Sequence, residues 1–337
     1  WNQVSIEIII HAQPSATGSL VRLLESLKKA DYSCSRPPHL TIELPHNIDE
    51  STSHYLRDFK WPTQIDQNQG NLLTLHHRIP QHSLTAEENS IRLLESFWPA
   101  DPFGSQILIL SPQIEVSPFF FHFLKYTILE YKYGSSNSEY KNSLFGISLD
   151  LPSFHLNDTT PFTPPSFNGH QFAPFLWQAP NSNACLYFAD KWVELHDFVA
   201  QSLNSQHTLP APPNMKKEVS KKFPSWLEYI LQLARLRGYM TLYPNIESTH
   251  SLVTVHNDLY KVPEEYELDF AIQEDASNNK ADKSYEKPSI HQKEKRPIKN
   301  SNFGFLSFHK KLSDLLVLSW EGVEMDMTKV KSYASDY

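Results

Sequence analysis

Residues 4–11 read VSIEIIIH, and this run decides the fold class that the sequence predicts. It is rich in β-branched residues and almost continuously apolar, as expected of a strand that a parallel sheet buries on both faces. A polar turn follows over residues 13–19, and leucines then recur at helical spacing at positions 20, 23, 24 and 27. A buried strand, a loop and a helix therefore open the chain.

The same alternation continues over about the first 130 residues. Further strands are predicted at residues 39–44, 71–75 and 106–110, and helices at residues 53–59 and 85–97. This order favours an α/β fold with a mostly parallel sheet flanked by helices. Because ligands of such sheets bind outside the carboxyl ends of the strands, we expect binding loops at residues 11–19, 44–52 and 111–118. Farther along, residues 226–237 predict a helix that Gly238 ends as a C-cap residue.

The composition fits one globular domain with insertions. Of 337 residues, 40% are hydrophobic and 12% aromatic, which is enough for a substantial core. The net charge is −8 and no basic stripe is interleaved with aromatics, which argues against a nucleic-acid partner. Cys34 and Cys185 are too few for a disulfide framework or a thiolate zinc site, and the sequence leaves their pairing open.

Several common site motifs are absent from the sequence. With 9 glycines against 24 prolines, the chain has no GxGxxG or GxxxxGK[ST], which excludes the usual dinucleotide dehydrogenases and P-loop NTPases. It also has no HExxH and no GxSxG, the signatures of common zinc proteases and serine hydrolases.

The sequence divides into three parts by composition. Residues 1–273 are predicted to form the main domain, and residues 274–301, with mixed charges and almost no apolar residue, a disordered charged loop. Residues 302–337 regain apolar character and are expected to pack back on the domain. No run of 18 apolar residues occurs. The chain starts at Trp1, so we expect a processed piece that a targeting segment or membrane anchor could precede.

A second informative stretch, LYFADKWVELHDFV, spans residues 186–199. At helical spacing Trp192 and Leu195 share an apolar stripe, and Glu194 and Asp197 lie together beside it, with His196 in the same turn. Two carboxylates and an imidazole within one turn suggest a site for a sugar hydroxyl or a metal. The alternative is a solvated helix start, where acids are favoured by the helix dipole.

Read together, the order of elements over residues 4–244 resembles a GT-A glycosyltransferase of the family-2 kind, in particular the fungal "glycosyltransferase 2" proteins. Residues 42–52 (IELPHNIDEST) are similar to that family's acidic, nucleotide-contacting turn, and residues 107–118 to its strand and metal motif. Residues 192–197 (WVELHD) resemble its Glu-Asp region, and residues 235–239 (RLRGY) its later helix-to-strand return.

The resemblance implies transfer of a sugar, with inversion, from a nucleotide-sugar donor to a hydroxyl of a glycan or other acceptor, in cell-wall or glycoconjugate synthesis. It implies Asp197 as catalytic base, with Glu194 as the competing choice and His196 beside them. The implied donor-binding residues are Glu43, Asp49, Ser111 and Gln113, and the implied acceptor-binding residues are Trp177, Gln178 and Trp192. The segments at residues 44–52, 111–118 and 194–197 are then expected around one cleft. With an anchor, the location implied is the lumenal side of the Golgi or ER membrane.

The metal motif departs from the resembled pattern. Where that family has Asp-x-Asp, this chain has Ser111-Pro112-Gln113, and Glu115 is the nearest carboxylate. Hard cations need anionic or carbonyl oxygens, so Mn²⁺ or Mg²⁺ would depend on Glu115, or Lys and Arg would neutralise the diphosphate instead. We therefore expect weak or no metal dependence.

Alternatives to these roles remain at the level of sequence. Trp177 and Trp192 are equally well explained as core residues, and Asp49 as a helix cap. The chain could also be a GT-A-shaped protein that binds a glycan or a partner without turnover, or an unrelated hydrolase that uses His196 and Asp197.

Overall fold

The structure is a computed structural model that describes residues 4–33, 36–62, 71–79, 86–134, 140–157, 160–165, 173–208, 217–246, 250–257, 260–267, 270, 296–297 and 311–336. Within this part of the chain, the largest sheet has nine strands in the order β13-β7-β9-β6-β8-β4-β1-β2-β3. Their bounds are β1 (Ser5–His11), β2 (His39–Leu44), β3 (Leu73–His77), β4 (Ser105–Leu110), β6 (Leu144–Ser148), β7 (Phe175–Trp177), β8 (Ala184–Tyr187), β9 (Met240–Tyr243) and β13 (Val317–Leu318).

Most neighbouring strands of this sheet are parallel. β1 pairs in parallel with β2 and β4, β2 with β3, β6 with β9, and β7 with β13. β8 is antiparallel to both β4 and β6, and β7 is antiparallel to β9. The predicted α/β fold with a mostly parallel sheet is confirmed.

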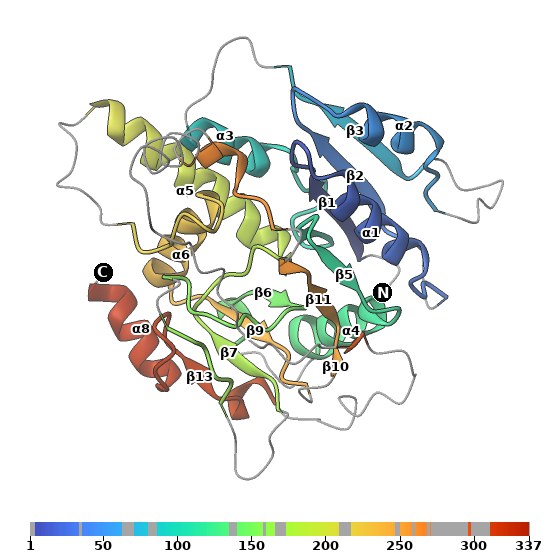
Figure 1. Ribbon diagram of the computed structural model, residues 1–337. Helices are drawn as coiled ribbons and strands as arrows, with labels where there is room; N and C mark the ends of the chain where they lie inside the picture. Colours follow the sequence, from blue (N-terminus) through green and yellow to red (C-terminus); the bar gives the residue numbers. More distant parts are fainter. Residues whose placement is uncertain are drawn as a thin grey trace, which may run out of the picture.

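Helices cover both faces of the sheet (Figure 1). The helices are α1 (Thr17–Lys28), α2 (Glu50–Asp58), α3 (Ala86–Glu95), α4 (Phe120–Thr127), α5 (Ala189–Thr208), α6 (Trp226–Arg237) and α8 (Met327–Asp336). In β1, Ile8 and Ile10 join the core under α1, α2 and α4, whereas Ile9 joins the core under α3, α5 and α6. The isoleucine run is therefore buried from both sides, as its pattern predicts.

Shorter elements complete the described chain. The π-helix η1 (Ile128–Tyr133) continues α4, and η3 (Lys141–Ser143), η5 (Glu264–Tyr266) and η7 (Leu312–Asp314) are 3₁₀ turns. Two small ladders join β5 (Ile114–Val116) to β11 (Val253–Val255) and β10 (His250–Ser251) to β12 (Arg296–Pro297). Apart from β12, the charged loop predicted at residues 274–301 lies outside the described residues. Among the described helices, none has the length and apolar character needed to cross a bilayer.

The strand directions define two edges of the sheet. β1, β2, β3, β4, β6 and β9 run the same way, so their carboxyl ends meet at one edge, here named the carboxyl edge. The opposite edge, where these strands begin, is named the amino edge. Since β2 and β4 flank β1 on its two sides, the strand order reverses at β1, and ligands of α/β sheets bind at such a switch point.

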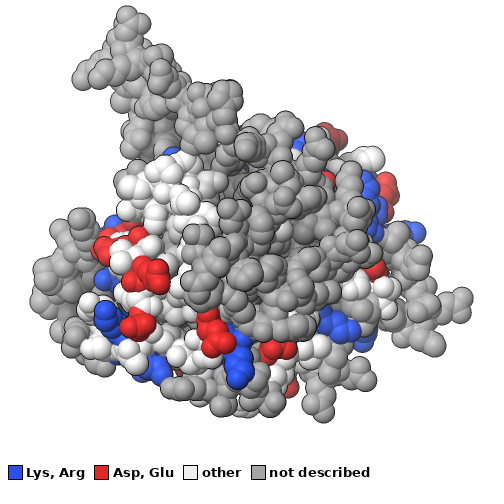
Figure 2. Space-filling model, turned by 90° about the horizontal axis from the view of Figure 1, so that it is seen from below, with Lys and Arg blue, Asp and Glu red and all other residues white. Residues whose placement is uncertain are grey.

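The charged surface is mixed on the face seen in Figure 2. Among the described residues there, Lys and Arg side chains are interspersed with Asp and Glu. A continuous basic band of the kind that follows a phosphate backbone is not visible among those residues.

Candidate functional site

Asp49 joins the loops that follow β1 and β2 at the carboxyl edge. Its carboxylate accepts hydrogen bonds from the Ser15 N–H (2.9 Å), the Thr17 hydroxyl (2.8 Å) and the Thr52 hydroxyl (2.9 Å). Burial alone would raise the pKa of Asp49, but these hydrogen bonds outweigh it and lower the pKa below its usual value. Asp49 therefore stands at the N-cap of α2, and its oxygens tie the two loops together.

A charged cluster lies near Asp49, at the ends of β1, β2 and β3. Glu43 of β2 is only 5% exposed, accepts a hydrogen bond from His76 Nδ1 (2.6 Å), and lies 3.8 Å from Arg78 Nε. Arg78 Nη2 is 2.7 Å from Nε2 of His11, the last residue of β1, and Glu264 of η5 faces the same pair. We name this group, His11, Glu43, His76, Arg78 and Glu264, the edge cluster.

Of these five residues, Glu43 was predicted as a donor-binding residue, and His11 opens the predicted binding loop at residues 11–19. Arg78 directly follows β3, and a charged residue just beyond a strand was the signal that could have identified it. Glu264 gave no such signal, because only the folded chain brings η5 to the end of β1.

A second polar group lies at the ends of β4 and β6. The Ser111 N–H donates to the Asn183 carbonyl (2.7 Å), and Gln113 Nε2 donates to Asn183 Oδ1 (3.4 Å). Asn183 Nδ2 in turn donates to Asp150 Oδ2 (3.0 Å), and Asp150 is 4% exposed. The predicted donor residues Ser111 and Gln113 therefore do reach the carboxyl edge. Asp150 was not among the residues predicted from the sequence; it lies two residues beyond the end of β6 at Ser148.

Glu115, the predicted metal ligand, is not grouped with other acidic side chains in the part of the chain that the structure describes. Glu115 Oε2 lies 3.2 Å from His256 Nε2, across the β5–β11 ladder. Among the residues that the structure describes, no three His, Cys, Asp or Glu side chains gather as a metal site would require. Ser111 and Gln113 supply no carboxylate, so the donor set around Glu115 does not fit Mn²⁺ or Mg²⁺.

The predicted catalytic segment lies at the amino edge. The Ala189 N–H at the start of α5 donates to Gln106 Oε1 (2.9 Å), and Gln106 is the second residue of β4. Glu194 Oε1 accepts from Arg237 Nε (2.7 Å), and Arg237 ends α6 just before β9 begins. Because β8 runs antiparallel to β4, the chain leaves β8 at the edge where β4 starts.

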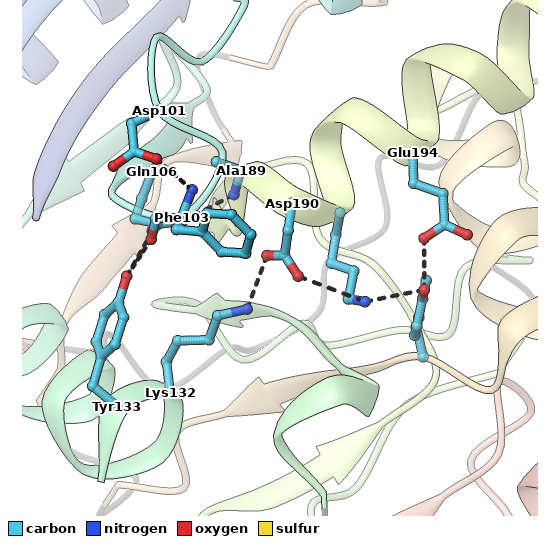
Figure 3. A network of polar contacts seen from close by, with 10 residues as sticks. Asp101, Phe103, Gln106, Lys132, Tyr133, Ala189, Asp190 and Glu194 are labelled. Atoms are coloured by element: carbon cyan, nitrogen blue, oxygen red, sulfur yellow. Dashed lines mark hydrogen bonds and ion pairs between the residues drawn. The ribbon is translucent and has the colours of Figure 1, made fainter. Parts of the chain in front are cut away.

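Glu194 is part of a polar network at this amino edge (Figure 3). Asp190 bonds Lys132 Nζ (2.8 Å) and lies 3.6 Å from Lys191 Nζ. Lys191 donates to the Tyr239 hydroxyl (3.1 Å), which donates to Glu194 Oε2 (2.6 Å). Both carboxylate oxygens of Glu194 thus hold the ends of α6 and β9 against α5.

The other two residues predicted to act in catalysis, His196 and Asp197, also lie on α5. His196 Nε2 donates to the Leu94 carbonyl (2.5 Å) near the end of α3 and so joins α5 to α3. Asp197 is exposed on α5. The prediction that residues 194–197 share one cleft with residues 44–52 and 111–118 is wrong. Because β8 is antiparallel to β4 and β6, α5 begins at the amino edge, whereas the other two segments lie at the carboxyl edge. Glu194, His196 and Asp197 therefore do not form the predicted catalytic group at the carboxyl edge.

The predicted acceptor-binding residues are buried. Trp177 and Trp192 are both 0% exposed; Trp177 stacks on Phe162 with 4.0 Å between ring centroids, and Trp192 Nε1 donates to the Phe97 carbonyl (3.2 Å). Gln178 is also buried, and its Nε2 donates to the Ala234 carbonyl (3.1 Å). Neither indole presents a face on which a sugar ring could stack, so the alternative interpretation of both tryptophans as core residues describes this structure.

Two solved structures illustrate what this chain is similar to. The crystal structure of S. aureus TarS 1-349 matches at 11% identity and a TM-score of 0.38, over 72% of this chain and 59% of that chain. The galactosyltransferase LgtC with donor and acceptor sugar analogs matches at 12% identity and a TM-score of 0.39, over 72% of this chain and 74% of that chain. This chain thus spans less than two thirds of the TarS structure, and both TM-scores lie below 0.5.

Among curated proteins, none matches this sequence significantly. A family model described as the SPBC1E8.03c C-terminal domain matches residues 18–208, which extend from the first turn of α1 to the end of α5 and leave out β1 and the loop after it. Since this match covers more than half of the chain, the protein belongs to the SPBC1E8.03c C-terminal domain family.

Proposed function

We propose that this chain is a glycosyltransferase domain that binds a nucleotide-sugar donor at the carboxyl edge and transfers its sugar to a hydroxyl of a glycan or another acceptor. One observation carries the proposal: the edge cluster and the Asp150–Asn183–Gln113 group lie at the ends of parallel strands on the two sides of the switch point at β1. Ligands of α/β sheets bind at this position. The resemblance in the order of elements adds support from the sequence.

The chemistry needs two things that this edge contains. The leaving diphosphate must be stabilised by positive charge or hydrogen-bond donors, and Arg78 supplies a guanidinium there. An inverting transfer also needs a base near the acceptor hydroxyl. With Glu194 and Asp197 at the amino edge, we assign this role to Asp150, the buried carboxylate beyond β6.

The experiment first screens nucleoside diphosphates by thermal shift and then measures donor affinity and transfer for two variants. Asp150→Asn keeps the size of the side chain but removes the proton acceptor, so donor affinity should survive while transfer falls by about 10²-fold or more. Asp197→Asn should leave both unchanged. Loss of transfer in Asp197→Asn with full transfer in Asp150→Asn would refute the new assignment.

A second candidate function is binding of a nucleotide sugar or glycan without turnover. The specific observation in its favour is that Ser111 and Gln113 carry no charge and that Glu115 is paired with His256. Under this alternative the wild-type protein binds a donor, and the donor is not consumed with any acceptor offered. Detectable transfer by the wild type would exclude it.

A further inference from the structure

The turn η5 lies over the carboxyl ends of β1 and β3 and is fixed there by the residues next to Glu264. Glu265 Oε1 accepts from the backbone N–H (2.8 Å) and hydroxyl (3.2 Å) of Ser225, directly before α6. Tyr266 is buried. These two anchors hold the turn, and Glu264 is thereby presented to His11 and Arg78.

Of the two terminal nitrogens of Arg78, Nη2 is hydrogen-bonded, and Nη1 has no hydrogen-bond partner among the described residues. Because a guanidinium only donates, the 2.7 Å contact between Arg78 Nη2 and His11 Nε2 makes that imidazole nitrogen the acceptor. The same nitrogen therefore cannot donate to Glu264, although it lies 3.5 Å from Glu264 Oε2. His11 thus orients Arg78, and Glu264 Oε2 is left without a hydrogen-bond partner among the described residues.

The contact between Arg78 and Glu264 is longer than a hydrogen bond. Arg78 Nη1 lies 3.8 Å from Glu264 Oε2, beyond the usual N–H···O range. Both atoms are buried, and neither has a hydrogen-bond partner among the residues described. The Arg78 side chain is 9% exposed; burial lowers its pKa, opposed by the charges of Glu264 and Glu43, and an arginine stays protonated even so.

We propose that Arg78 Nη1 is the donor of a site for a phosphate-type anion, and that Glu264 is an internal carboxylate that occupies this site when the ligand is absent. A guanidinium binds carboxylate and phosphate oxygens with the same geometry, so the two anions exclude each other. Arg92 of α3 adds a second positive charge that acts on both Arg78 and Glu264. This inference rests on the proposed function, because the anion would be the diphosphate of the donor.

The test measures the affinity of inorganic pyrophosphate and of UDP by calorimetry for three proteins. Glu264→Gln keeps the shape of the side chain and removes the competing charge, so pyrophosphate should bind about tenfold more tightly than to the wild type. Glu267→Gln is the matched control: it removes the same charge from an exposed residue of the same segment, and the affinity should stay at the wild-type value. Thermal melting establishes that each variant is folded at the assay temperature.

A double variant identifies the donor. Adding Arg78→Gln to Glu264→Gln should abolish the gain. The proposal is overturned if Glu264→Gln binds pyrophosphate no more tightly than the wild type, if Glu267→Gln gains as much, or if the double variant keeps the gain. A gain for both pyrophosphate and UDP places the diphosphate at Arg78, whereas a gain for UDP alone would overturn the diphosphate assignment.

The two proposals fail separately. If Glu264→Gln gains affinity for pyrophosphate and no donor is ever transferred, the anion site stands and the transferase proposal falls. If the sugar of a donor is transferred and the donor affinity is the same in Glu264→Gln as in the wild type, the transferase proposal stands and the anion site falls.

Discussion

Replacing Glu194 by alanine should destabilise the protein without affecting ligand binding. The side chain accepts hydrogen bonds from Tyr239 (2.6 Å) and Arg237 (2.7 Å) and so joins α5 to α6 and β9. A hydrogen bond to a charged acceptor contributes about 1.5–3 kcal/mol when partly buried, and an ion pair with an exposed arginine below about 1 kcal/mol. With 56% of the Arg237 side chain exposed, the second contact adds little. We expect the free energy of unfolding to fall by about 2 kcal/mol.

The assay is urea denaturation with the nucleotide affinity measured in parallel. The midpoint of Glu194→Ala should fall while the m-value stays the same, because the surface exposed on unfolding does not change. Asp197→Asn is the control on the same helix: this side chain is exposed, so its substitution should change stability by less than about 0.5 kcal/mol. The reasoning is refuted if Glu194→Ala is as stable as the wild type yet loses donor binding or transfer, since that would return the functional site to the amino edge.

Four further outcomes are expected. Asp49→Ala should lower the free energy of unfolding by about 1 kcal/mol at neutral pH, after allowance for solvent screening. Because the pKa of Asp49 is lowered in the folded protein, its contribution to stability is present above the ordinary carboxyl range and is lost as the pH falls through the folded pKa. The stabilities of the wild type and the variant should therefore converge at acid pH. Burial raises the pKa of Cys185 to about 12, so in a Cys34→Ser background a thiol reagent should label the native protein only after denaturant is added. Trp177→Ala should cost about 3–5 kcal/mol by chemical denaturation, because a completely buried ring leaves a cavity. Donor binding measured with excess chelator should match binding without it, whereas complete loss would show that Glu115 or another acid holds an ion.

Local sequence patterns were enough to predict several helices and strands and the class of the sheet. The isoleucine run of β1 alternates between the two cores, so a continuous apolar strand was sufficient to predict burial on both faces. Gly238 ends α6 with φ 67°, as predicted from its place after the last apolar turn, because only glycine enters that backbone region without a steric penalty. Strand burial and helix termination of this kind depend on neighbours within a few residues, so they can be predicted from local periodicity.

Which side chains meet depends on long-range strand pairing and packing. The antiparallel direction of β8 moved Glu194 and Asp197 to the amino edge, and nothing within residues 186–199 encodes a strand direction, since pairing is set by partners far away in the chain. The same holds for Arg78 and Glu264, which are brought together only when η5 is anchored beside α6. Helical spacing placed Trp192 on an apolar stripe, but it did not show whether the ring lies in the core or binds a ligand. Both roles need an apolar helix face, and only the packing of the folded chain shows that this face is covered.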